Sequence, residues 1–254
     1  MKITVFTSNK LRHISLINLL SEISEKVFAV VEEKPKKKNL HEYFKFVELA
    51  EKQSFKNKEI KSKNIEVINL RKNSINELKR NNIYRALKSD YYVVFGTSII
   101  KGWLLDELID NEALNVHLGV SPYYRGSACN FWSIYENNPH FTGASIQKLS
   151  SKVDDGEILY HAIPDIQKCN NTFDFSMRAV LAAQKTLVNK LKTKAIHKIS
   201  FIPNDNKKII RVCWRKDFNE KVANLFLKQN NFDNIKKLYF KKFEKRLFHN
   251  IEIH

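Results

Sequence analysis

Two polar residues, Asn115 and His117, stand two positions apart in an otherwise apolar run, residues 113–118. Side chains alternate along a strand, so both would point to one face of a sheet while their apolar neighbours point to the other. An amide donates hydrogen bonds and a histidine exchanges protons near neutral pH, so the pair suits proton transfer or the stabilisation of negative charge. The alternative is that both side chains satisfy backbone groups of the following loop.

An acidic turn later in the chain offers a third group. Asp154 precedes the next expected strand and has enough intervening chain to return to His117. An aspartate followed shortly by a glycine, here Gly156, is also ordinary turn composition. Taken by themselves, these residues leave open both a chemical and a purely structural role for Asp154.

Alternating strands and helices must position these residues. This alternation predicts an α/β, Rossmann-like fold with a mostly parallel, doubly wound sheet, in which ligands bind beyond the carboxyl ends of the strands. Apolar runs such as residues 26–31 are typical of parallel strands buried on both faces. Strands are expected over residues 2–7, 26–31, 65–70, 91–95, 113–118, 142–149 and 157–162, and helices over residues 11–23, 41–52, 74–88, 172–190 and from about 128.

The chain is expected to divide near residue 198. Residues 1–198 would form the main domain, and residues 199–254 a small C-terminal extension. The extension is expected to contain a hairpin, residues 199–202 with 209–214, and two helices, residues 217–228 and 233–248.

Composition limits the classes of partner. The 254 residues carry 44 Lys and Arg against 27 Asp and Glu, a net charge of +17. Basic residues are spread along the chain, including an expected loop at Lys36–Lys38, so the charge fits either a lysine-rich composition or an anionic ligand. Three scattered cysteines, with no CxxC or HExxH pattern, give no sign of a metal site, and no metal is expected.

Hydropathy gives no reason to expect a membrane partner. No apolar run approaches the roughly 20 residues that cross a bilayer. The first residues lead directly into an expected strand and lack the pattern of a signal peptide. We therefore expect a cytoplasmic protein.

The spacing of the polar residues and the loop between them resembles a known signature. The combined pattern is similar to that of the folate-dependent formyltransferases, which include glycinamide ribonucleotide formyltransferase, methionyl-tRNA formyltransferase and the sugar N-formyltransferases. Similarity is clear over about residues 90–165 and looser from residue 1 to about 198. The pattern consists of Asn115-x-His117, Ser121-Pro-x-Tyr-Arg-Gly126, Thr142-Gly143 and Asp154-x-Gly156.

The resemblance implies that 10-formyltetrahydrofolate is the co-substrate and that Asn115, His117 and Asp154 are catalytic. As a primary amine attacks the formyl carbon, Asn115 and protonated His117 would donate hydrogen bonds to the formyl oxygen. His117 would also carry protons, and Asp154 would orient it, favour its charged form or hold a relaying water. Neither a metal nor a covalent enzyme intermediate is required.

The same resemblance implies a folate pocket formed by the loop after the strand at residues 91–95. The alternative for the two isoleucines of this loop is that they continue the core. The residues expected to bind folate are Gly96, Ile99, Ile100 and Lys101, with Val153 and Asp155 on the opposite side.

Three acceptors compete for the formyl group. The glycinamide ribonucleotide enzyme has a glycine-rich phosphate loop after its first strand, whereas residues 6–12 here keep Ser8-Asn9 and lack the glycines. Methionyl-tRNA formyltransferases carry a C-terminal β-barrel, whereas residues 199–254 look short and largely helical. The +17 charge keeps tRNA open as a partner, because basic surfaces bind RNA backbones.

Residues 121–132 look closer to the sugar N-formyltransferases, which are also similar in size. The preferred acceptor is therefore an amino sugar, nucleotide-linked, with tRNA ranked below it. A homodimer is a further expectation, and a non-catalytic, basic RNA-binding protein on the same fold is the alternative from another class. The candidate acceptor contacts are Ser8, Asn9, Arg12, His13, Tyr124, Arg125 and Gly126.

Overall fold

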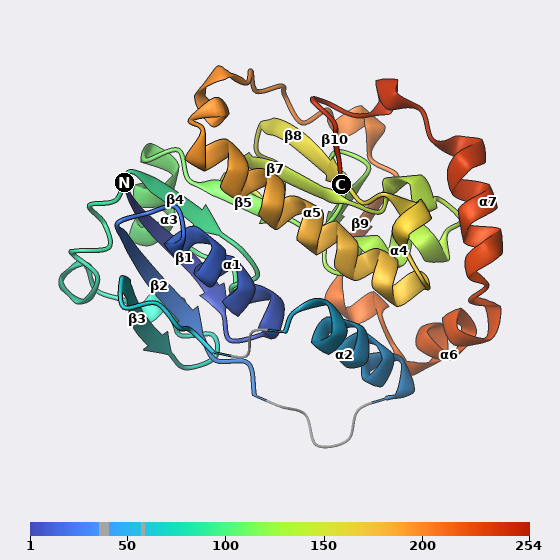
Figure 1. Cartoon of the computed structure of the whole chain (residues 1–254), viewed down its shortest axis with the longest axis horizontal. Helices are drawn as coiled ribbons and strands as arrows, with labels where there is room; N and C mark the ends of the chain where they lie inside the picture. The colour runs from blue at the N-terminus through green and yellow to red at the C-terminus, as the bar shows by residue number, and fades with distance from the viewer. Residues whose placement is uncertain (36–40, 57–58) are drawn as a thin grey trace.

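The computed structural model describes residues 1–35, 41–56 and 59–254, and within these ranges eight strands form one sheet. The predicted loop at Lys36–Lys38 lies outside the described residues. In spatial order the strands are β10 (Glu252–Ile253), β8 (Ile158–Ile163), β7 (Ala144–Lys148), β5 (Leu114–His117), β4 (Tyr91–Val94), β1 (Lys2–Ser8), β2 (Lys26–Glu32) and β3 (Ile65–Leu70) (Figure 1).

Strand directions agree with the predicted class. Neighbouring strands are parallel except β7, which runs antiparallel to both β5 and β8. Strands β1 and β2 are buried on both faces, as is typical of parallel strands between two layers of helices; all but the first residue of each is buried. The mostly parallel, Rossmann-like sheet is therefore confirmed.

Helices cover both faces of this sheet (Figure 1). On one face, α1 (Leu11–Ser21) and α5 (Thr172–Lys192) pack into a core with β1, β2 and β8. On the other face, α3 (Trp103–Asp110) buries Leu104 and Leu108 against β2 and β4. Leu114 and Val116 of β5 belong to the core on the first face, so the polar side chains of β5 point to the second face.

A second, aromatic core lies beside the sheet. It joins α4 (Cys129–Tyr135) to α6 (Glu220–Gln229) and α7 (Phe232–Lys242), and Tyr43 from α2 (Glu42–Ser54) packs on it. Figure 1 shows α6 and α7 at the periphery, beyond α4 and α2. This core fixes the C-terminal helices to the loop that follows β5.

Asparagine residues cap the N-termini of three later helices. Asn171, Asn219 and Asn231 stand directly before α5, α6 and α7, and each side chain accepts a hydrogen bond from backbone N–H in the first turn. Asparagine is among the best residues for this position, and each cap is worth about 1 kcal/mol. The asparagine-rich composition therefore contributes directly to where these helices begin.

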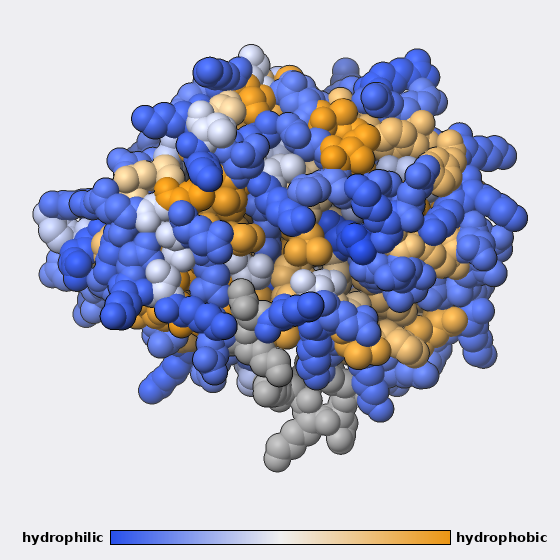
Figure 2. All heavy atoms as spheres, viewed as in Figure 1, coloured by the Kyte–Doolittle hydropathy of each residue, from blue (hydrophilic) through white to orange (hydrophobic). Residues whose placement is uncertain are grey.

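The visible surface is mainly hydrophilic. Figure 2 shows charged and polar residues over most of one face, interrupted by small apolar patches. Within the described ranges, no helix combines the length and the apolar character that crossing a membrane needs.

The helix predicted over residues 74–88 is wrong. The structure has two short 3₁₀ turns there, Ile75–Glu77 and Arg80–Asn82. Instead of capping a helix, the hydroxyl of Ser74 donates to the carbonyl oxygen of Arg71, and Leu78 is extended. The serine and glutamate that suggested a capping box therefore belong to successive turns.

The predicted C-terminal hairpin is also wrong. Ile202 pairs with Ile158 at the start of β8. The second half of the expected hairpin is β9 (Arg211–Cys213), which pairs in parallel with β6 (Tyr124–Gly126) in a separate two-stranded sheet. Both halves thus find partners far away in the sequence, and the chain between them lies against the loop after β5.

The rest of residues 199–254 is helical and then returns to the sheet. The two predicted helices correspond to α6 and α7, although α7 ends at Lys242 because Phe243 is extended. The last strand, β10, adds to the edge of the central sheet beside β8. The boundary at residue 198 stays a prediction.

His161 on β8 attaches the C-terminal segment to the main sheet. Its Nε2 donates to the carbonyl oxygen of Ser121 at 2.7 Å, and its Nδ1 accepts from the backbone N–H of His249 at 2.9 Å. A ring that donates through one nitrogen and accepts through the other is neutral. Burial lowers the pKa of His161 to about 4.

Acid is therefore expected to destabilise this attachment. An unfolded histidine has a pKa of about 6.5, so the unfolded chain binds more protons and stability is lost as the pH falls from about 6.5 towards 4. Between pH 7 and pH 5, the wild type should lose about 2 kcal/mol more unfolding free energy than His161→Gln. Urea unfolding at the two pH values measures this difference, and equal losses in both proteins would contradict it.

Candidate active site

Asn115, His117 and Asp154 meet on the face of the sheet opposite α5. The first two lie on β5, and the alternation of side chains directs both to this face, as predicted. Asn115 Nδ2 donates to Asp154 Oδ1 at 2.9 Å, and His117 Nδ1 lies 3.1 Å from Asp154 Oδ2. The structure therefore brings together the three residues that the sequence suggested.

The hydrogen bonds of His117 define its protonation. Its Nε2 lies 3.0 Å from the carbonyl oxygen of Tyr124, and the side chain is almost completely buried. A carbonyl oxygen and an ionised carboxylate can only accept, so both ring nitrogens must donate, and the ring is an imidazolium. Burial alone would lower the pKa of His117, but the charge and hydrogen bond of Asp154 outweigh it and raise this pKa.

Asp154 is ionised for the complementary reason. Burial alone would raise the pKa of its carboxyl group. The charge and hydrogen bond of His117, with further hydrogen bonds from Asn115 and the backbone N–H of Gly126, hold the pKa below its ordinary value. The result is a buried ion pair whose carboxylate has three hydrogen-bond donors.

Two unusual backbone conformations bring the donors to the carboxylate. Asp154 has a φ of 51°, a left-handed conformation that non-glycine residues adopt at a cost of about 1 kcal/mol or more. Gly126, whose N–H donates to Asp154 Oδ2 at 3.1 Å, has a φ of 95°. A Cβ atom on Gly126 would lie 2.4 Å from the carbonyl oxygen of Cys213, so β9 can approach only a glycine here.

The site keeps one neutral donor available. Asn115 Nδ2 carries two hydrogens, and within the described part of the chain only Asp154 accepts one of them. Both N–H groups of His117 are in use, so its Nε2–H must leave the Tyr124 carbonyl to reach another oxygen. Asn115 can thus donate a hydrogen bond to a substrate oxygen that lies beside the positively charged ring of His117. The same ring has a proton that it can transfer.

The residues predicted to bind folate have different environments. Ile99 and Val153 are exposed, at 61% and 55%, and offer apolar surface. Ile100 instead belongs to the core beneath α3, which agrees with the alternative that it continues the core. The loop is fixed by Asn76, whose side chain bonds the carbonyl oxygen of Ile99 and the N–H of Lys101.

The remaining two folate candidates lie in tight turns. Gly96 has a φ of 72°, and a Cβ atom there would lie 2.3 Å from the ring of His13. Asp155 forms an ion pair with Arg125.

Four of the predicted acceptor contacts, Ser8, Asn9, Arg12 and His13, lie at the end of β1 and the start of α1. In the sheet, β4 lies between β1 and β5. Ser8 is fully buried, and its hydroxyl pairs with Nδ1 of His13 at 2.7 Å. Burial lowers the pKa of His13, with a smaller contribution from Arg12. Asn9 accepts from the N–H of Lys34, and Arg12 forms an ion pair with Glu51 at 3.0 Å.

Two further predicted acceptor contacts, Tyr124 and Arg125, lie on β6. The side chain of Tyr124 is fully buried, and its hydroxyl donates to Glu136. Its contact with the acceptor stays a prediction. Arg125 is also buried, and its guanidinium binds Asp155, Asn204 and Asn206.

Asn204 and Asn206 were missed by sequence analysis. They lie in an asparagine- and lysine-rich stretch that resembles an ordinary loop, and nothing in its pattern indicates that it reaches the Asp154 turn. The apolar pair Phe201 and Ile202 is the one signal in this stretch, and its pattern favours one half of a hairpin.

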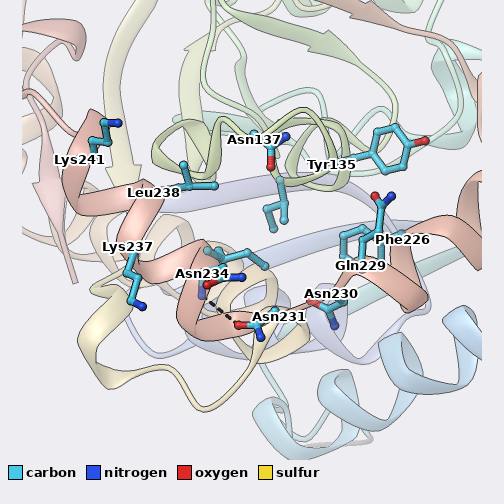
Figure 3. Close-up of a pocket in the computed structure, with 12 residues that line it drawn as sticks. Tyr135, Asn137, Phe226, Gln229, Asn230, Asn231, Asn234, Lys237, Leu238 and Lys241 are labelled. Carbon is cyan, nitrogen blue, oxygen red and sulfur yellow. Dashed lines mark hydrogen bonds between the residues drawn. The ribbon is translucent and has the colours of Figure 1, made fainter.

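Two surface cavities lie away from the cluster of Asn115, His117 and Asp154. One of about 420 Å³ lies between α4, α6 and α7, and Figure 3 shows its asparagine-rich lining with Lys237 and Lys241 at one side. A second, of about 610 Å³, lies between α2, α5 and α6. None of the three clustered residues lines either cavity. Across the described ranges, no group of three or more His, Cys, Asp or Glu side chains is arranged to hold a metal.

Comparison with known structures places the fold. The chain is 19% identical to the formyltransferase PseJ from Anoxybacillus kamchatkensis, solved with UDP-4,6-dideoxy-4-formamido-L-AltNAc and tetrahydrofolate, over 94% of this chain and 97% of that one, with a TM-score of 0.53. Phosphoribosylglycinamide formyltransferase from Anaplasma phagocytophilum is 14% identical over 84% of this chain and 99% of that one, with a TM-score of 0.54.

Sequence comparison gives the family. The chain is 26% identical over 176 residues to a methionyl-tRNA formyltransferase from Prochlorococcus marinus, a match that covers 69% of this chain and 51% of that protein. The chain thus spans about half the length of this curated relative. The model of the formyl transferase family matches residues 1–191, which include all three clustered residues. The chain therefore belongs to the formyl transferase family.

Proposed function

We propose that this protein transfers a formyl group from 10-formyltetrahydrofolate to a primary amine. The observation that carries the proposal is the buried cluster of Asn115, His117 and Asp154, in which a positively charged imidazolium lies beside an amide with an unused donor. Attack of an amine on a formyl carbon puts negative charge on the formyl oxygen, and these groups are suited to stabilise it. Family membership supports the same reaction.

Each of the three residues has a distinct role in this proposal. The free N–H of Asn115 donates to the formyl oxygen, while His117 contributes positive charge beside it. As an imidazolium, His117 gives its Nε2 proton to the departing nitrogen, and the neutral ring then accepts the proton that leaves the attacking nitrogen, which restores the imidazolium. Asp154 keeps the ring charged and oriented.

The residues present fit a folate co-substrate, which supplies an activated formyl group when bound. Asn115 and His117 offer hydrogen-bond donors to the formyl oxygen. Val153, next to Asp154, exposes an apolar side chain suited to packing against the flat ring of the folate. We propose that Ile99, the backbone of Gly96 and Lys101, Val153 and Asp155 hold the folate.

An amino sugar on a nucleotide is the preferred acceptor. Residues 121–132 resemble those of the sugar N-formyltransferases, and PseJ, with a similar fold, was solved with a nucleotide-linked formamido sugar. The curated relatives favour methionyl-tRNA as the second candidate. Glycinamide ribonucleotide is the third.

A panel of amines tests the proposal. The protein is incubated with 10-formyltetrahydrofolate and, separately, with nucleotide-linked 3- and 4-amino sugars, methionyl-tRNA and glycinamide ribonucleotide, and tetrahydrofolate release and formylated product are measured. We expect turnover with at least one amino sugar. Turnover with methionyl-tRNA alone would keep the reaction and change the acceptor. No turnover with any acceptor, combined with tight RNA binding, would reject the enzyme in favour of an RNA-binding protein.

A further inference from the structure

Asn204 joins the C-terminal segment to the turn that carries Asp154. Its side-chain Nδ2 donates to the carbonyl oxygens of Asp154, at 3.0 Å, and of Gly156, at 3.2 Å. Because two carbonyls face this nitrogen, both amide hydrogens are used and the orientation of the amide is fixed. Asn204 therefore holds the backbone on both sides of Asp155.

The other end of the same amide is held by a buried cation. Asn204 Oδ1 accepts from Arg125 at 2.7 Å, and Arg125 also binds Asp155 and Asn206. Arg125 belongs to β6, immediately before the glycine whose N–H donates to Asp154 Oδ2. The side chain of Asn204 thus bridges the two chain segments that together position the Asp154 carboxylate.

We propose that Asn204 is a positioning residue for formyl transfer, acting through the backbone of Asp154. This inference rests on the function proposed above. Asn204 lies outside residues 1–191, the part matched by the family model, so it is supplied by this chain's own C-terminal segment. It reaches the reacting groups only through Asp154 and is not itself catalytic.

The physical reason is the unfavourable backbone of the turn. Asp154 has a left-handed φ of 51°, which only surrounding contacts can maintain. Losing the two bonds from Asn204 releases the peptide groups around it, and the carboxylate is then free to move away from the imidazole. Besides Asp154, the titratable groups that influence His117 are Cys213 on β9 and His161 on β8, and neither touches Asn204.

Three variants separate this role from a general loss of stability. Asn204→Ala removes both donors and the acceptor for Arg125. Asn204→Asp keeps an acceptor for Arg125 but turns a carboxylate oxygen towards two carbonyls. Asn206→Ala is the matched control, because Asn206 also accepts from Arg125, at 2.6 Å, and makes no bond to the Asp154 turn.

The readouts are kcat, KM for the amine and the pKa of His117 followed by NMR. We expect kcat to fall about tenfold or more in both Asn204 variants with KM nearly unchanged, because a small misplacement of a catalytic group has effects of this size. The pKa of His117 should fall by about half a unit or more as Asp154 loosens. Asn206→Ala should behave as the wild type in both measurements.

The NMR titration keeps the two proposals separate, because it needs no turnover. If the wild type lacks transfer activity but Asn204→Ala lowers the pKa of His117, the proposed function fails and the positioning role stands. If both Asn204 variants fold and leave the pKa of His117 and kcat unchanged, Asn204 has no positioning role. If Asn204→Ala fails to fold, Asn204→Asp provides the same two readouts.

Discussion

Replacing His117 with alanine is expected to lower kcat for formyl transfer by about a hundredfold or more. The variant loses the imidazolium that is proposed to carry the proton and to lie beside the developing oxyanion, and each of these contributions is typically worth this much. The measurement is the steady-state rate with 10-formyltetrahydrofolate and the acceptor found in the panel of amines, compared with the wild type at the same pH.

An exposed histidine gives the matched control. Among the described residues, the side chain of His197 has its hydrogen bond with the hydroxyl of Tyr91, and His197→Ala should retain the wild-type rate. Removing His117 leaves the carboxylate of Asp154 buried without its partner, so circular dichroism must accompany the assay. His117→Asn, which keeps a polar side chain, is the second variant if the alanine protein is unfolded. A folded variant with the full rate would show that His117 is not catalytic.

Replacing Asp154 with asparagine is expected to have a comparable effect, about a hundredfold on kcat, through the charge state of His117. In the wild type Asp154 raises the pKa of His117, so the imidazolium persists above the ordinary value of about 6.5 and is lost as the pH rises through the raised pKa. Without the carboxylate, burial dominates and lowers this pKa. As the pH rises, the rate of Asp154→Asn should therefore begin to fall at a lower pH than the rate of the wild type, because its imidazolium is lost earlier.

NMR titration of His117 in the wild type and in Asp154→Asn measures this shift directly. Asp110→Asn is the control, because it also removes one carboxylate charge, at the exposed end of α3. An unchanged pKa of His117 in Asp154→Asn would mean that the ion pair does not determine its protonation.

Strong local patterns made the sheet predictable. An unbroken apolar run such as residues 26–31 has few alternatives to a buried strand, and the alternation along β5 places Asn115 and His117 on one face without knowledge of distant residues. The contact between Asp154 and His117 is different, because no local rule brings a turn back to a particular strand. It was the combined spacing of the family signature that indicated this contact.

The wrong predictions concern a hairpin whose two halves pair with distant segments and a helix that local turns replace. Residues 209–214 alternate like one half of a hairpin, but β9 pairs with β6 because Gly126 permits close approach. Ser74 has the composition of a helix cap and binds Arg71 instead.

The way residues 199–254 rejoin the sheet affects how such enzymes can be recombined. An enzyme assembled from the first 191 residues of this chain and the C-terminal part of a relative would receive a foreign edge strand in place of β10 and would lose Asn204 beneath the Asp154 turn. An exchange at residue 191 therefore replaces a side chain that contacts the Asp154 turn as well as an edge strand of the sheet. A productive crossover point must lie beyond Cys213, so that the loop after β5 keeps its own partner strand.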